Sequence, residues 1–165
     1  YKRLKAQGVT LRCYDPNLSL TQNPDLTTLD EVLQCDVISM HTPLVTDGAH
    51  PSFHLLGHDE LRQLKPGAVL INCGRGPVID NRALLDVLAE RDDLRVVLDV
   101  WEPEPDISLE LLDKIELGSP HIAGYSYDGK LNGTEMIYRA LCQHIDKKPD
   151  TSLAQLVTPL ENNLL

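Results

Sequence analysis

The stretch AVLINCGRGPVID, residues 68–80, decides the fold of this chain, because it joins a short apolar run to a charged turn. Residues 68–73 have the length and the β-branched content of a buried strand. Arg75 follows directly, between Gly74 and Gly76. Loops at the ends of buried strands often carry binding residues, so a permanently charged guanidinium at this point indicates a binding role.

Similar apolar runs recur along the chain and alternate with helical patterns. This alternation requires crossover connections, and it predicts an α/β fold with a Rossmann-like doubly wound parallel sheet that is covered on both faces. The predicted strands are 9–16, 36–43, 68–73 and 95–100, with 118–124 as a further strand, and the predicted helices are 1–8, 28–34, 58–67, 80–93, 109–115 and 133–145.

Helix boundaries are marked by capping signals. Gly8 is a left-handed stop for the first helix, and Thr28 with Glu31 matches a capping box. Asp80 is the predicted N-cap of the helix over 80–93, in which Leu84, Val87 and Leu88 share one face.

Composition narrows the class of protein. The net charge of −10 repels polyanions, so we expect no nucleic-acid partner, and no apolar run is long enough to predict a membrane span. The cysteines are scattered without a CxxC spacing, which favours free thiols in a reducing cytoplasm, with a single disulfide as the weaker alternative. These cysteines are Cys13, Cys35, Cys73 and Cys142.

Polar side chains follow each predicted strand at its carboxyl end. In open parallel sheets ligands bind at this edge, so the sequence predicts that these side chains share one rim. Each residue alone is more often a turn or helix cap, and only their joint placement favours a site. The residues are Asp15, Thr42 with its neighbour His41, Arg75, Asp99 and His121.

Arg75 is suited to hold a carboxylate at this rim. Its planar fork of donors matches a carboxylate, and the flanking Gly74 and Gly76 allow a positive φ and close approach of a ligand. An arginine that bridges two loops is an equally weighted alternative.

An acid and an imidazole form a second candidate group. Glu102 and Glu104 lie in the proline-rich loop WEPEP, residues 101–105, and His121 lies in the following segment. A carboxylate beside an imidazole fixes its tautomer and produces an acid–base catalyst. The spacing does not decide which glutamate pairs with His121, and the other is expected to be a solvated loop acid.

The segments INCGRGPVID, VVLDVWEPEP and SPHIAG together resemble the D-2-hydroxyacid dehydrogenase family, whose nucleotide-binding domains carry Arg, Asp, Glu and His in this order. The longer segments MHTPLVTDG and HIAGYSYDGKLNGTE are similar to a branch that acts on a phosphorylated 2-hydroxy acid. The resemblance implies that Arg75 is the substrate-orienting catalytic arginine, that His121 is the general acid–base, and that Glu104 is its partner. Glu102 is then the glutamate expected to be a solvated loop acid.

The resemblance also implies the cofactor and partners. Asp15 matches the acid that hydrogen-bonds the adenosine ribose, which favours NAD over NADP. Tyr125 matches a substrate-contacting position, together with Arg75, and a homodimer is implied for the full-length protein. The other matching cofactor positions are Thr42, Cys73, Gly74, Arg75, Asp99 and Gly124.

The chain departs from the family pattern in one respect, since it contains no G-x-G-x-x-G. We therefore expect a fragment that lacks the first strand and the glycine-rich loop and binds NAD poorly by itself. The lost strand is predicted to lie between 9–15 and 68–73, which would leave exposed strand edges. The expected parts are a nucleotide-binding part over 1–128, a helix returning to the substrate domain over 129–149, and the start of a dimerisation region over 150–165.

Two other functions remain as alternatives. Another family member, acting on phosphoglycerate, glyoxylate or hydroxypyruvate, would differ around Tyr125. A non-enzymatic NAD-sensing module of the corepressor kind would keep a similar Arg-Glu-His set.

Overall fold

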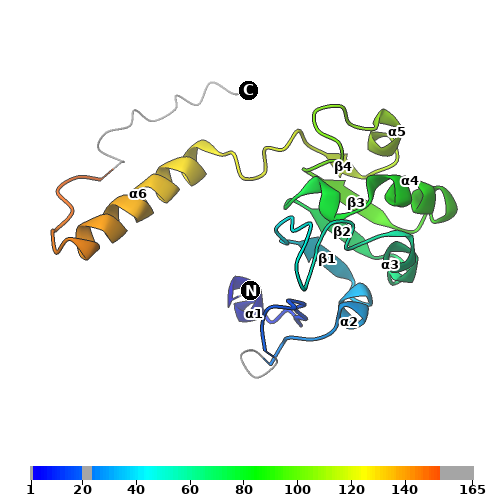
Figure 1. Cartoon of the computed structure of the whole chain (residues 1–165), viewed down its shortest axis with the longest axis horizontal. Helices are drawn as coiled ribbons and strands as arrows, with labels where there is room; N and C mark the ends of the chain where they lie inside the picture. Colours follow the sequence, from blue (N-terminus) through cyan, green and yellow to red (C-terminus); the bar gives the residue numbers. More distant parts are fainter. Residues whose placement is uncertain (1, 20–23, 153–165) are drawn as a thin grey trace. The chain divides into compact units, whose positions relative to one another are not determined.

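A parallel sheet forms the centre of the structure. The computed structural model describes residues 2–19 and 24–152. Its strands are β1 (Val37–Met40), β2 (Val69–Asn72), β3 (Arg95–Leu98) and β4 (Leu117–Gly118), and they pair in the order β1-β2-β3-β4, all parallel. The predicted parallel α/β fold is therefore confirmed (Figure 1).

The helices follow most of the predicted positions. Thr28 and Asp80 are N-caps, because their side chains accept hydrogen bonds from backbone N–H groups of the first turn, as predicted. Gly8 has the positive φ, 77°, of a left-handed helix stop. The helices are α1 (Lys2–Ala6), α2 (Leu29–Leu33), α3 (His58–Gln63), η1 (Gly76–Val78, a 3-10 turn), α4 (Asn81–Glu90), α5 (Leu109–Leu112) and α6 (Tyr127–His144).

The core lies between one face of the sheet and the row of helices α2 to α5, each of which packs against the next. Alternate strand residues are buried because side chains alternate between the two faces of a strand. Each fully buried leucine contributes roughly 1.5–3 kcal/mol to folding. The buried core includes Ile38, Leu70, Val96 and Leu98 from the sheet and Ala83, Leu84 and Val87 from α4.

The opposite face of the sheet is less covered in the described residues. Val37 is 56% exposed, Ser39 is exposed, and Ile71 and Val97 are only partly buried. Among the described residues β1 pairs on one side only, with β2, so it is an exposed edge, whereas the exposed edges were expected at 9–15 and 68–73.

The sequence prediction was wrong for the first strand. Residues 9–16 form no strand with the sheet, and their only ladder contact in the described chain is an isolated bridge between Cys13 and Leu26. A strand requires a paired neighbour, and this segment has none beyond that bridge. The predicted gap beside residues 68–73 is also wrong, because β2 pairs with β1 on one side and β3 on the other.

Contacts divide the chain into two compact units, one ending at His121 and one beginning at Ile122. In the second unit α6 begins at Tyr127, earlier than the predicted start at residue 133, because the Ser126 hydroxyl accepts a hydrogen bond from Gly129 N at 3.0 Å and caps the helix. In the part of the chain that the structure describes, every helix is too short or too polar to cross a membrane.

Candidate active site

His121 lies just beyond the carboxyl ends of β3 and β4. Its backbone N–H donates to the Asp99 carbonyl at 2.8 Å, which ties this segment to the residue that follows β3. Its φ is 56°, an unusual conformation for a residue other than glycine. Such conformations persist where the surrounding structure fixes them, and they concentrate at functional sites.

Glu104 pairs with His121. Oε2 of Glu104 lies 2.8 Å from His121 Nδ1, and Oε1 accepts a hydrogen bond from Trp101 N at 2.9 Å. Burial alone raises the pKa of the Glu104 carboxyl, but the hydrogen bonds from His121 and Trp101 outweigh it, so the pKa lies below its ordinary value. Because Nδ1 is engaged by a carboxylate, Nε2 of His121 is the nitrogen left to exchange a proton.

Arg75 is presented by a turn that Asn72 holds. The Asn72 side chain is completely buried; its Nδ2 donates to the Arg75 carbonyl at 3.0 Å and its Oδ1 accepts from Gly74 N at 3.1 Å. Arg75 itself is exposed, and its Nη1 donates to the Gly74 carbonyl at 2.8 Å. Among residues 2–19 and 24–152 no carboxylate is ion-paired with Arg75, so it does not bridge two loops by a salt bridge.

The glycines beside Arg75 serve a different purpose from the one expected. Neither adopts a positive φ. A Cβ on Gly76 would overlap the backbone of Trp101, and a Cβ on Gly74 would lie 3.4 Å from the carbonyl oxygens of Met40 and Thr42. The close approach is therefore made by the protein's own backbone, and it brings the Arg75 turn against the loop that carries Glu104.

Asp99 and Cys73 flank this region. Asp99 is buried, and its Oδ1 accepts a hydrogen bond from the Ser119 hydroxyl at 2.6 Å, two residues before His121. Cys73 is exposed, and partial burial together with the negative charge of Asp99 raises the pKa of its thiol. All four cysteines are free thiols.

An open cavity of about 340 Å³ adjoins the Glu104–His121 pair. Its walls are largely apolar, with Trp101, Ile107 and Leu112 beside the two polar groups. An apolar wall around one acid–base pair is the usual composition of a small-molecule site.

A second cavity brings together two of the predicted cofactor residues. Asp15 and Thr42 both line this space of about 290 Å³, although 27 positions separate them in the chain. Asp15 Oδ1 accepts a hydrogen bond from Asn17 N at 2.9 Å, which fixes the carboxylate at the mouth of the turn. A carboxylate and a hydroxyl fit the ribose of a dinucleotide, so the donor set here is compatible with the adenosine half of NAD.

Two of the predicted residues, Gly124 and Tyr125, belong to the second unit. Tyr125 is exposed, and the Lys130 ammonium lies 3.3 Å from the centre of its ring. A Cβ on Gly124 would meet no atom within 4 Å, so no close approach in the described structure requires glycine there. Their roles toward substrate and cofactor stay predictions.

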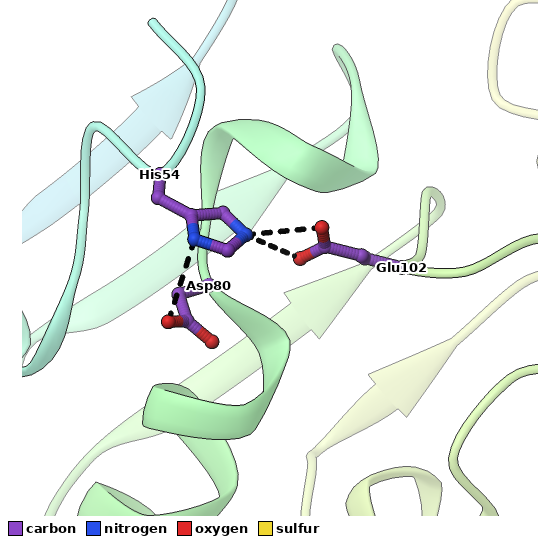
Figure 2. A group of neighbouring side chains, drawn as sticks. All are labelled: His54, Asp80 and Glu102. Carbon is purple, nitrogen blue, oxygen red and sulfur yellow. Dashed lines mark hydrogen bonds and ion pairs between the residues drawn. The ribbon is translucent and has the colours of Figure 1, made fainter.

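Sequence reasoning missed a second cluster, which Figure 2 shows. His54 Nε2 lies 3.0 and 2.9 Å from the two carboxylate oxygens of Glu102, and Nδ1 lies 3.5 Å from Asp80 Oδ2. Glu102 is therefore half-buried and paired, not the solvated loop acid that was expected. Its partner is 48 positions away, so no local spacing could have indicated it.

Comparison with known proteins identifies a matching family. Residues 1–123 match the model described as D-isomer specific 2-hydroxyacid dehydrogenase, NAD binding domain. A relative named erythronate-4-phosphate dehydrogenase, from Cellvibrio japonicus, is 71% identical over 165 residues, which is all of this chain and 44% of the relative. One of the same name from Pseudomonas syringae pv. tomato is 52% identical over 155 residues, covering 93% of this chain and 41% of the relative. The chain thus spans less than half of the length of these curated relatives.

Solved structures share the fold. A glyoxylate reductase from Paecilomyes thermophila is 26% identical with a TM-score of 0.65, and the match covers 94% of this chain and 48% of that one. A Rhodotorula graminis D-mandelate dehydrogenase is 28% identical with a TM-score of 0.63, covering 84% and 42%.

Proposed function

Because this chain belongs to the D-isomer specific 2-hydroxyacid dehydrogenase family, as part of its NAD binding domain, we propose that the complete protein oxidises 4-phospho-D-erythronate with NAD. The reaction converts the 2-hydroxyl group to a ketone and yields 3-hydroxy-2-oxo-4-phosphooxybutanoate. The observation that carries the chemistry is the 2.8 Å contact between Glu104 and His121. The choice of substrate is supported by the 71% identity to the relative named erythronate-4-phosphate dehydrogenase.

His121 acts as the base in this reaction. Nε2 accepts the proton of the C2 hydroxyl, and the resulting imidazolium is stabilised by the Glu104 carboxylate on Nδ1. Because the pKa of Glu104 is lowered, the carboxylate stays ionised throughout the neutral range. In the reverse direction the same imidazolium returns the proton to the carbonyl oxygen.

Arg75 orients the substrate. Its exposed guanidinium has no carboxylate partner within the described residues, so it is available to take the substrate carboxylate in a two-point contact and to polarise the developing carbonyl. The Asn72-held turn keeps the guanidinium at the rim.

The cofactor is held from the same edge of the sheet. Asp15 and Thr42 bind the adenosine ribose, and Cys73, Gly74 and Asp99 contribute to the cofactor-facing surface. Gly124 is a further cofactor contact by its match to the family pattern. When bound, NAD⁺ supplies the acceptor for the hydride that leaves C2.

The cellular setting follows from the same assignment. We place the reaction in vitamin B6 biosynthesis and the protein in the cytoplasm, where its free thiols stay reduced. The phosphate group of the substrate contributes to binding in addition to its carboxylate, and Tyr125 contacts the substrate. The functional assembly is a homodimer.

The test uses the complete protein with 4-phospho-D-erythronate and NAD⁺, and it follows NADH formation. His121→Gln should lower kcat by about 10²-fold or more, since an amide cannot accept the proton. His58→Gln is the matched control, because His58 pairs with Asp86 on the surface at 3.3 Å and should leave kcat unchanged. Full activity of His121→Gln would exclude His121 as the base, and turnover of a different 2-hydroxy acid alone would exclude this substrate.

A further inference from the structure

The loop after β3 carries two glutamates, and only one of them belongs to the acid–base pair. Glu104 contacts His121, whereas Glu102 turns to the cluster of His54 and Asp80 (Figure 2). All three side chains of this cluster are between 23% and 32% exposed, so their contacts are partly shielded from solvent.

His54 is held in place from several directions. Its backbone N–H donates to the Pro77 carbonyl at 2.8 Å, and its ring stacks on Phe53 with 3.9 Å between ring centroids. Its φ of 50° is the left-handed conformation, which is uncommon for residues other than glycine. The ring is therefore fixed between the two carboxylates.

The two carboxylates approach different ring nitrogens. Glu102 lies at Nε2 and Asp80 at Nδ1. One nitrogen of His54 and one oxygen of each carboxylate lie within 4.8 Å of one another, but the direct contacts run to different ring nitrogens, so the imidazole itself bridges the two carboxylates. The cluster therefore connects segments of the protein.

Each partner of His54 is anchored in turn. Oδ1 of Asp80 accepts hydrogen bonds from Arg82 N and Ala83 N, both at 2.9 Å, and so caps α4. The Glu102 backbone N–H donates to Asn81 Oδ1 at 3.2 Å. The start of α4 is thereby joined to the loop 101–105 through His54 and Asn81.

We infer that His54 is a positioning residue for the acid–base pair, acting through Glu102 to hold the loop 101–105 so that Glu104 meets His121. Glu102 is two residues from Glu104, and Trp101 N binds the Glu104 carboxylate directly, so the register of this short loop sets where that carboxylate lies. The expected effect on turnover rests on the proposed function. The expected effect on the structure of the loop does not depend on that function and can be measured separately.

The structural readout is residue-level hydrogen exchange of the amides in 101–105. In the complete protein His54→Ala should speed exchange of Trp101 N–H, because its acceptor Glu104 is no longer held, while His58→Ala should not. Unchanged exchange in His54→Ala overturns the inference, whether or not the wild type oxidises 4-phospho-D-erythronate.

The kinetic readout is a double-mutant cycle with Glu104→Gln. His54→Ala should lower kcat by about 10-fold or more and shift the pH profile of kcat, with little change in the KM for NAD⁺. His54→Gln, whose amide can still donate to Glu102, should recover part of the loss. The double variant should be no slower than Glu104→Gln alone, because both changes remove the same interaction.

Two kinetic outcomes would overturn the inference. One is a double variant in which the two losses multiply, since His54 would then act independently of Glu104. The other is wild-type turnover that depends on added Zn²⁺ or Mn²⁺ and loses that dependence in His54→Ala, which would make the cluster a metal site. A wild type inactive on every 2-hydroxy acid tested would refute the proposed function alone.

Discussion

Asn72 shows how one buried polar residue can organise a catalytic turn. It occupies the last position of β2, where a hydrophobic residue would add to the core. Its side-chain amide instead forms hydrogen bonds with the Arg75 carbonyl and with Gly74 N. A buried amide with both ends satisfied costs little and fixes geometry.

Replacing Asn72 should therefore harm stability and activity together. Asn72→Ala leaves Gly74 N–H and the Arg75 carbonyl without their partner, which should cost about 1–3 kcal/mol of unfolding free energy and reduce kcat. Urea unfolding and steady-state kinetics measure the two effects. Asn132→Ala, at an exposed position of α6, is the control and should change the unfolding free energy by less than about 0.5 kcal/mol. Equal stability of the two variants would contradict the role given to Asn72.

Gly76 and Gly133 allow a comparison between the effect of close backbone packing and the effect of intrinsic helix propensity. Gly76→Ala places a methyl group into the Trp101 backbone, so it should destabilise the protein by about 1–3 kcal/mol or more. Gly133→Ala adds a methyl group in open space within α6 and should instead favour the helix by about 0.5–1 kcal/mol. Thermal unfolding of the two variants measures both effects, and an unchanged melting temperature for Gly76→Ala would contradict the close approach of Gly76 to Trp101.

At the scale of single residues, the sequence predicts only part of the candidate site. Arg75, Glu104 and His121 were found because they occur in the same order as in the D-2-hydroxyacid dehydrogenase family, whereas the spacing alone left the choice between Glu102 and Glu104 open. His54 could not be found in that way, because it acts through a partner 48 positions away. The reason for the glycines beside Arg75 was also hidden, since the contact of Gly76 with Trp101 depends on the fold.

At the scale of elements, the sequence predicted correctly those helix caps and strands that depend only on neighbouring residues. Caps at Thr28 and Asp80 and the apolar runs of β1 to β3 are short-range features, and the structure confirms them. Residues 9–16 have the composition of a strand but lack a partner in the described sheet, and composition cannot supply one.

One connection between elements should give a pH-dependent stability. Asp93 follows α4; its Oδ2 accepts from Gly67 N at 2.8 Å, ahead of β2, and it pairs with Arg91. The Arg91 side chain and the Gly67 N–H lower the pKa of Asp93 from 3.8 to about 2. The stabilisation is therefore fully present above pH 3.8 and is lost as the pH falls toward 2.

Urea unfolding as a function of pH tests this connection. Asp93→Asn should lower the unfolding midpoint at neutral pH, and its difference from the wild type should shrink as the pH falls through this window. Asp92→Asn, its exposed neighbour, should show no such convergence. A constant difference at all pH values would mean that charge on Asp93 does not stabilise the fold.

At the scale of the whole molecule, burial is concentrated in the first unit. Within the described residues of the second unit Cys142 is the only buried side chain, while Met136, Ile137 and Leu141 of α6 are exposed. In contrast, α4 buries half of its length against the core. Stability of a segment follows the number of its buried apolar contacts.

Hydrogen exchange of residues 1–165 should reveal this contrast. Amides of α6 should exchange about tenfold or more faster than those of α4, because every 1.4 kcal/mol less of opening free energy is a factor of ten in exchange. Mass spectrometry of peptides from the two helices gives the comparison. Equal protection would mean that α6 is stabilised by contacts that its exposed side chains do not indicate.

The close approach of Gly76 to Trp101 has a practical consequence. The chain has a single tryptophan, and its indole Nε1 donates to the Ser119 carbonyl at 2.9 Å while its backbone contacts the arginine turn and the Glu104 carboxylate. Its ring also lines the cavity that His121 borders. Residues 1–165 therefore carry one fluorophore, whose backbone contacts the Arg75 turn and Glu104 and whose ring lies beside the cavity that His121 lines, so its ultraviolet emission can report occupancy of the site in this chain without any label.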